Sequence, residues 1–177
     1  MKIQISTVAV ALMLTAACGS NSSSPAPSSP TAPSPSGPSS VVTNWSLTQR
    51  FVSVTGPDNC WVREQRARLT GATFPNLPAV ITRPGDGSIK LESPFFQVNY
   101  AGAVSGAEFS ASGTLPLDGG GRPCQDGTSF QQMPGVSNLA GRFSADDRLL
   151  TATEVNSYQL TSGELVSYRW DWQATRN

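Results

Sequence analysis

In the segment near the end of the chain, Glu164–Ala174, apolar and polar side chains alternate from Val166 onward. The apolar set is Val166, Tyr168, Trp170, Trp172 and Ala174, and the polar set is Ser167, Arg169, Asp171 and Gln173. Because successive side chains of a strand point to opposite faces, this pattern predicts a strand with one buried face and one hydrated face. A chain that contains such a strand needs a sheet with an apolar side, so we expect a mainly β fold.

The preceding segment is predicted to pair with this strand through a hairpin. If Thr161–Gly163 forms the loop, Glu154 lies opposite Trp170. This register turns Glu154 and Asn156 toward the face of the aromatic side chains, whereas a shift by one residue would turn both to solvent. A buried carboxylate without a partner costs several kcal/mol. We therefore expect Glu154 to serve either a ligand or a structural hydrogen-bond network.

Further segments rich in β-branched and aromatic residues are bounded by turn residues, which predicts strands at Trp45–Thr55, Ala79–Arg83, Ser88–Glu92, Phe96–Val104, Ala107–Thr114, Ser137–Ser144 and Leu149–Leu160. Thr73–Pro78 is expected to be a proline-broken linker, and the Gly-rich segment around Gly119–Gly121 a long loop. About eight short strands joined mostly by tight turns favour an antiparallel up-and-down β-barrel.

One short helix is expected after the first strand. Asp58 or Asn59 can cap it, and it runs to about Leu69, with Gly71 available as the stop. Its basic residues surround an acidic one, which predicts a solvated helix face that comprises Arg63, Glu64, Arg66 and Arg68. The formal net charge of the chain is zero, which argues against nucleic acid as a partner.

The strand count and the early and late tryptophans, Trp45 and Trp170, resemble the calycin group of lipocalin-like and avidin-like barrels. The Gly-x-Trp signature of true lipocalins is absent, because Asn44 directly precedes Trp45. The resemblance implies a barrel that holds small, often apolar molecules. An outer-membrane barrel would need an apolar exterior, and the polar face of Glu164–Ala174 argues against one.

The chain has three cysteines, Cys18, Cys60 and Cys124. The last two are expected to form a disulfide between two turn-rich loops, as in proteins of oxidising compartments. The bridge would close a loop of roughly 65 residues and restrict the unfolded state by roughly 4 kcal/mol. The alternative, a reactive thiol, lacks a supporting histidine.

The beginning of the chain has the layout of a secretory signal: Lys2, the apolar run Ile3–Leu14, and then small residues before Cys18. The apolar run is too short for a transmembrane helix. The segment resembles the lipobox of bacterial lipoproteins, although Thr15 stands where the family most often has leucine. The resemblance implies removal of residues 1–17 and lipidation of Cys18, and Gly19 resembles the outer-membrane sorting pattern. The alternative is a plain secretory signal with an incidental Cys18.

The next segment, through Ser40, contains mostly Ser, Pro, Ala, Thr and Gly and has no charge. Such a segment cannot bury enough apolar surface to order itself, so residues 18–40 are expected to be a disordered tether. Residues 41–177 are expected to be the barrel domain. The predicted location is therefore the cell envelope, with the chain lipid-anchored to a membrane and facing the periplasm or the outside, and the outer membrane is favoured in a Gram-negative cell.

The sequence favours no enzyme class. It contains no histidine, which removes the commonest general base and the usual zinc sites. The glycines after Asp118 are not followed by the residues of a phosphate loop. Asp86 and Asp146–Asp147 are explained by turn chemistry. A carboxylate pair could still catalyse hydrolysis with Glu154 as the acid, but no second carboxylate has an inward position. We expect no catalytic residue, no cofactor and no metal.

Two functions remain open for the predicted barrel. In one, a small hydrophobic or amphipathic ligand binds beside Glu154, Asn156, Tyr158, Tyr168, Trp170 and Trp172. In the other, these side chains fill the barrel, which then serves a structural or protein-interaction role with partners that the sequence does not name. A cavity of roughly 300 Å³ or more beside Glu154 would favour the first function.

Overall fold

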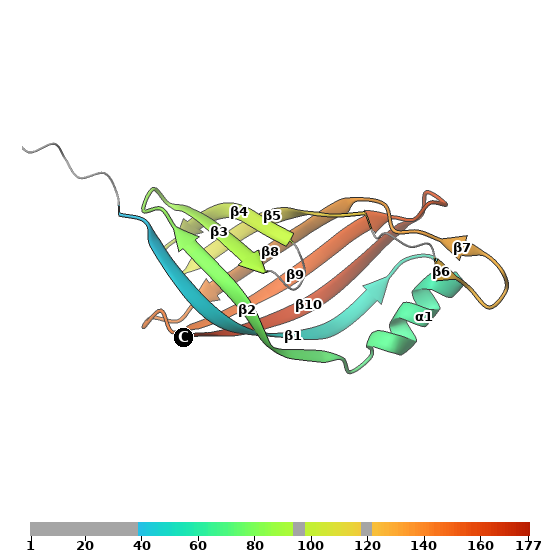
Figure 1. The fold of residues 1–177 in the computed structure, drawn as a ribbon, viewed down its shortest axis with the longest axis horizontal. Coiled ribbons are helices and arrows are strands. Elements are labelled where there is room, and N and C mark those ends of the chain that lie inside the picture. Colours follow the sequence, from blue (N-terminus) through green and yellow to red (C-terminus); the bar gives the residue numbers. More distant parts are fainter. Residues whose placement is uncertain (1–38, 94–97, 118–121) are drawn as a thin grey trace, which may run out of the picture. The chain divides into compact units, whose positions relative to one another are not determined.

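The computed structural model describes residues 39–93, 98–117 and 122–177 and contains one closed antiparallel barrel (Figure 1). The strands follow one another around it in the order β1-β10-β9-β8-β5-β4-β3-β2. Their bounds are β1 Val41–Thr55, β2 Thr73–Arg83, β3 Ser88–Ser93, β4 Val98–Ser105, β5 Glu108–Leu115, β8 Gly135–Phe143, β9 Leu149–Gln159 and β10 Leu165–Arg176. The predicted up-and-down barrel is confirmed. The start expected for the fourth strand, at Phe96, lies outside the described residues.

Strand β1 closes the barrel by pairing with β10 on one side and β2 on the other. It begins at Val41, four residues before the predicted start at Trp45. Its inward side chains alternate from Thr43 to Phe51. The register with β10 then shifts between Phe51 and Ser53, which marks a bulge. With 15 residues, β1 is long enough to run from one end of the barrel to the other (Figure 1).

The predicted helix is confirmed as α1, Cys60–Leu69. The Asn59 side chain caps it by accepting a hydrogen bond from the Val62 amide at 3.0 Å, and Gly71 follows with a φ of 78°. Its buried side chains are Trp61, Val62, Gln65 and Leu69, and the four charged residues of the predicted solvated face are exposed. Among the described residues, no helix is long and apolar enough to cross a membrane.

Two predicted loop segments are strands. Thr73–Pro78 belongs to β2, where we expected a linker. This part of β2 pairs with β1, whereas its pairing with β3 covers only Val80–Thr82. Pro75 and Pro78 thus lie where one edge of β2 has no partner strand among the described residues, and a missing N–H is tolerated there. In the Gly-rich loop, β6 (Arg122–Pro123) and β7 (Ser129–Phe130) form a small separate sheet.

The register predicted for β9 and β10 is confirmed. Glu154 lies opposite Trp170, Asn156 opposite Tyr168, and Tyr158 opposite Val166. The hairpin loop keeps the predicted length, because the Leu160 amide donates to the Glu164 carbonyl at 2.9 Å. Glu154 consequently faces the interior and is 2% exposed.

The barrel end at which β1 begins is filled by side chains. Trp45 packs on Phe143 with ring centroids 5.9 Å apart, and Phe109 packs on Phe143 at 5.2 Å. The Trp45 Nε1 donates to the Thr43 hydroxyl at 2.8 Å, so its polar atom is satisfied. At Gly141 a Cβ would lie 2.3 Å from the Thr151 carbonyl oxygen, so only glycine permits the close approach of β8 to β9.

Candidate functional site

A buried polar cluster surrounds Glu154 in the middle of the barrel. One carboxylate oxygen, Oε2, accepts from Gln49 Nε2 at 2.5 Å and from Trp172 Nε1 at 2.8 Å. The other, Oε1, accepts from the Tyr100 hydroxyl at 2.7 Å and from the Ser137 hydroxyl at 2.9 Å. We call these five residues the Glu154 network. The donors come from β1, β10, β4 and β8, so the network joins strands from around the barrel.

The Glu154 network has no cation. None of the ion pairs among the described residues involves Glu154, and its four partners are neutral donors. Burial raises the pKa of Tyr100 above its ordinary value, and the charge of Glu154 and the hydrogen bond to it raise that pKa further. Both carboxylate oxygens are thus already occupied by protein groups. This arrangement matches the structural network that was one of the two roles expected for Glu154.

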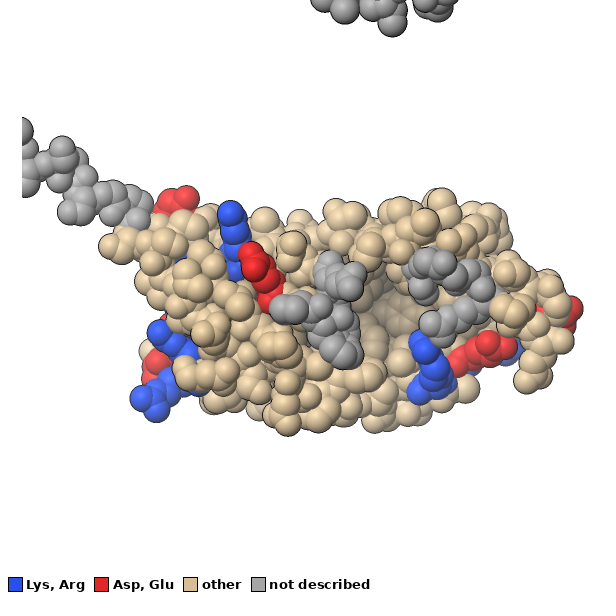
Figure 2. Space-filling model, in the orientation of Figure 1, with Lys and Arg blue, Asp and Glu red and all other residues tan. Residues whose placement is uncertain are grey.

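A cavity of about 260 Å³ lies at the other end of the barrel, under α1. We call it the α1 pocket. Its walls are Trp61, Gln65, Arg68 and Leu69 from α1, Phe74 from β2, Leu115 from β5, Gln132, and Asn156, Tyr158, Tyr168 and Trp170 from β9 and β10. Figure 2 shows one face of the molecule, which is hollowed at its centre and carries few charged side chains.

Five aromatic side chains stand in the wall of the α1 pocket. Tyr158 and Tyr168 stack with ring centroids 5.6 Å apart, and Phe74 lies 6.0 Å from Trp170. Trp61 on α1 donates from Nε1 to the Tyr158 hydroxyl at 3.4 Å, which ties the helix to the barrel. Burial raises the pKa of Tyr168, and the neighbouring Tyr158 raises it further.

Polar side chains, among them Asn156, Gln65 and Arg68, give the α1 pocket directional chemistry. Asn156 Oδ1 is buried and has no hydrogen-bond partner in the protein. Gln65 is 5% exposed and accepts from Arg68 Nη2 at 2.6 Å. Arg68 is the charged residue of the pocket wall. A ligand that fills this space would meet aromatic faces and one guanidinium group, with the side chain of Asn156 in the wall.

The structure separates the six candidate residues into two groups. Asn156, Tyr158, Tyr168 and Trp170 line the α1 pocket, whereas Glu154 and Trp172 belong to the Glu154 network. The cavity of about 260 Å³ thus lies under α1, whereas the cavity that would favour ligand binding was specified beside Glu154. Sequence reasoning missed the wall residues on α1, although Trp61, Gln65 and Arg68 follow one another at helical spacing and could have been placed on one face.

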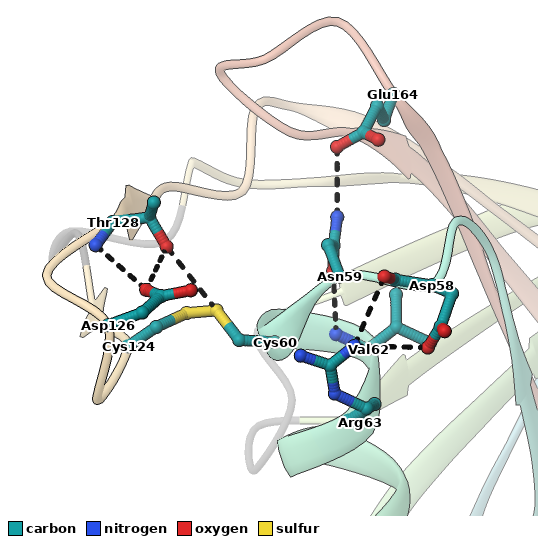
Figure 3. Close-up of a disulfide and its surroundings, with 9 residues drawn as sticks. All are labelled: Asp58, Asn59, Cys60, Val62, Arg63, Cys124, Asp126, Thr128 and Glu164. Atoms are coloured by element: carbon teal, nitrogen blue, oxygen red, sulfur yellow. Dashed lines mark hydrogen bonds and ion pairs between the residues drawn. A yellow bond between two sulfur atoms is a disulfide. The ribbon is translucent and has the colours of Figure 1, made fainter.

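The predicted disulfide between Cys60 and Cys124 is present (Figure 3), with the two Cα atoms 6.0 Å apart. Cys60 is the first residue of α1, and Cys124 follows β6. Asp126 orders the turn after Cys124 by accepting from the Thr128 amide at 3.0 Å and from its hydroxyl at 2.6 Å. The bridge thereby holds the beginning of the helix that covers the pocket.

A second hollow, of about 870 Å³, lies on the outside of the barrel. Its polar rim includes Glu108, Arg142 and the exposed pair Arg50–Asp171, whose nitrogen and oxygen atoms are 2.9 Å apart. Exposed ion pairs contribute little to stability. Ligand sites are lined mainly by apolar and aromatic side chains, and the α1 pocket, with five aromatic side chains in its wall, is the stronger candidate site. The predicted lipidation residue, Cys18, and residues 18–38 of the predicted tether lie outside the described residues.

Comparison with known proteins places the chain in no family. No family model matches it, and no curated protein matches it. Among solved structures, it is similar to a mutant of the vaccine antigen transferrin binding protein B from Haemophilus parasuis, with 12% identity and a TM-score of 0.37. The alignment covers 77% of this chain but 25% of that protein, so the chain spans about a quarter of its length. The barrel assignment rests on the strand pairing alone.

Proposed function

We propose that this chain is a lipid-anchored protein of the bacterial cell envelope that binds a small, mainly apolar ligand in the α1 pocket. The observation that carries the proposal is a cavity of about 260 Å³ with five aromatic side chains in its wall, which is also lined by Asn156, whose buried Oδ1 has no hydrogen-bond partner. Ligand sites commonly combine apolar walls with a few convergent polar groups, and typical volumes begin at about 300 Å³. The ligand is therefore small.

The α1 pocket lies near Phe74 and Trp170, at the end of the barrel opposite to Val41, where β1 begins and pairs with the end of β2 at Arg83.

The proposal includes no catalytic activity. The buried carboxylate of Glu154 accepts four hydrogen bonds from neutral donors, and these partners include no second carboxylate. The absence of histidine from the sequence removes the commonest general base.

The alternative is a lipoprotein that acts by protein interaction and carries no ligand. The filled end around Trp45 and Phe143 favours it, because it shows that much of the interior is side-chain core. The outer hollow, with its mixed charges, would then be the surface to examine.

Native mass spectrometry of the full-length protein purified from the envelope separates the two functions. The proposal predicts an extra mass that leaves on activation. Gln132→Trp, which introduces a large ring at the pocket wall, should abolish the extra mass, whereas Gln159→Trp on the exposed outer face should retain it. A bare wild-type mass, or an extra mass that survives in the Gln132→Trp variant, would contradict binding in the α1 pocket.

A further inference from the structure

Among the described residues, the wall of the α1 pocket carries positive charge only. Arg68 contributes a guanidinium group to the wall, and the part of the wall formed by described residues includes no Asp or Glu. Other arginines, such as Arg50 and Arg63, pair with carboxylates, but Arg68 forms no ion pair with any residue in the described part of the chain. A ligand that carries a negative charge would therefore meet an uncompensated cation.

Arg68 is held in position at the pocket. Its Nη2 donates to Oε1 of the buried Gln65 at 2.6 Å, and Gln65 lies one helical turn earlier on α1. The positive charge of Arg68 also lowers the pKa of Tyr168, which opposes the larger effect of burial. The guanidinium group is thus close enough to influence the aromatic wall, and its other N–H groups are available to a carboxylate.

The shape and chemistry of the remaining wall favour a flat ring. Aromatic pairs prefer offset-stacked or edge-to-face contacts, which a planar ligand can form with Trp61, Trp170 or Tyr158. Asn156 Oδ1 lacks a donor, so a ring N–H could satisfy it. The small volume leaves no room for a bulky molecule.

We infer that the α1 pocket selects small aromatic carboxylic acids, whose ring packs among the aromatic walls and whose carboxylate binds Arg68. This inference rests on the proposed ligand-binding function. Arginine binds carboxylates through charge-assisted and often bidentate hydrogen bonds, which distinguishes an acid from an uncharged ligand of the same shape.

Indole-3-acetate and its uncharged amide, indole-3-acetamide, are matched probes for isothermal titration calorimetry with the full-length protein. The acid should bind about tenfold more tightly than the amide, the size of a hydrogen bond to a charged group. Arg68→Gln should remove this preference, so that the variant binds the acid and the amide with equal affinity. Arg66→Gln is the matched control, because Arg66 is exposed on the same helix and does not line the pocket.

The two proposals fail in different ways. Equal affinity for acid and amide, or a preference that persists in the Arg68→Gln variant, would overturn the selection of acids and leave ligand binding in place. Absence of binding by both probes at millimolar concentration would also overturn the inference. If native mass spectrometry also finds the protein without a bound molecule, the two results together overturn the proposed function as well.

Discussion

Replacement of Glu154 by glutamine and by leucine tests how the Glu154 network stabilises the barrel. The donor-only groups Gln49 Nε2 and Trp172 Nε1 both bind Oε2, whereas two hydroxyl groups, which can also accept, bind Oε1. A glutamine can place its oxygen at the Oε2 position and its NH₂ group at the hydroxyls. We therefore expect Glu154→Gln to change the free energy of unfolding by less than about 1 kcal/mol, since it also removes a buried charge.

Leucine at position 154 cannot accept any hydrogen bond. Tyr100 and Ser137 can still bond to each other, because their oxygens are 3.0 Å apart. Gln49 Nε2 and Trp172 Nε1 would then be two buried donors without an acceptor, each costing about 1–3 kcal/mol. Glu154→Leu should thus destabilise the protein by about 2–6 kcal/mol.

Urea unfolding, with the midpoint and the slope m compared between variants, measures both effects. Glu92→Gln, at an exposed glutamate of β3, is the control and should leave the midpoint unchanged. If the glutamine variant loses as much stability as the leucine variant, the charge itself stabilises the fold and our reasoning about donor geometry is wrong. A leucine variant as stable as the wild type would show that the network contributes nothing.

Three further predictions follow from the fold. Burial raises the pKa values of Tyr100 and Tyr168 above the ordinary value of 10.0, so both keep their protons in the folded protein at pH values at which the unfolded chain loses them. The free energy of unfolding should therefore be constant just below about pH 10 and fall above it by about 1.4 kcal/mol per pH unit per tyrosine. Tyr100→Phe should reduce that slope when urea unfolding is measured at a series of pH values. Cys124→Ser should lower the free energy of unfolding by up to about 4 kcal/mol, whereas an unchanged urea midpoint would show that the bridge does not restrict the unfolded chain. Gly141→Ala should cost about 1–3 kcal/mol in thermal unfolding, because its Cβ would lie 2.3 Å from a carbonyl oxygen of β9, while Ala140→Ser on the outer face should be neutral.

The barrel could be predicted from the sequence because its signals are local. Alternation in Glu164–Ala174 specified the buried face of β10, and the length of the Thr161–Gly163 loop specified the pairing with β9. The even pair Cys60 and Cys124 identified the disulfide. Asn59 provided a recognisable helix cap.

The site could be predicted only in part because it depends on distant contacts. The inward direction of Glu154 followed from register, but its partners Gln49, Tyr100 and Ser137 lie on strands whose positions around the barrel no local pattern specifies. The same is true of α1, whose packing over the barrel makes Trp61 part of the pocket wall. Thr73–Pro78 was predicted wrongly because tertiary pairing with β1 overrode the local effect of its prolines.

A crystal structure of the protein purified from its native envelope, without added ligand, tests the central proposal most directly. We predict electron density for a small non-protein molecule in the α1 pocket, in contact with Trp170 and within hydrogen-bond distance of Asn156 Oδ1. A pocket that contains only water bound to Asn156, or that is closed by repacking of Trp61, would contradict a ligand-binding function.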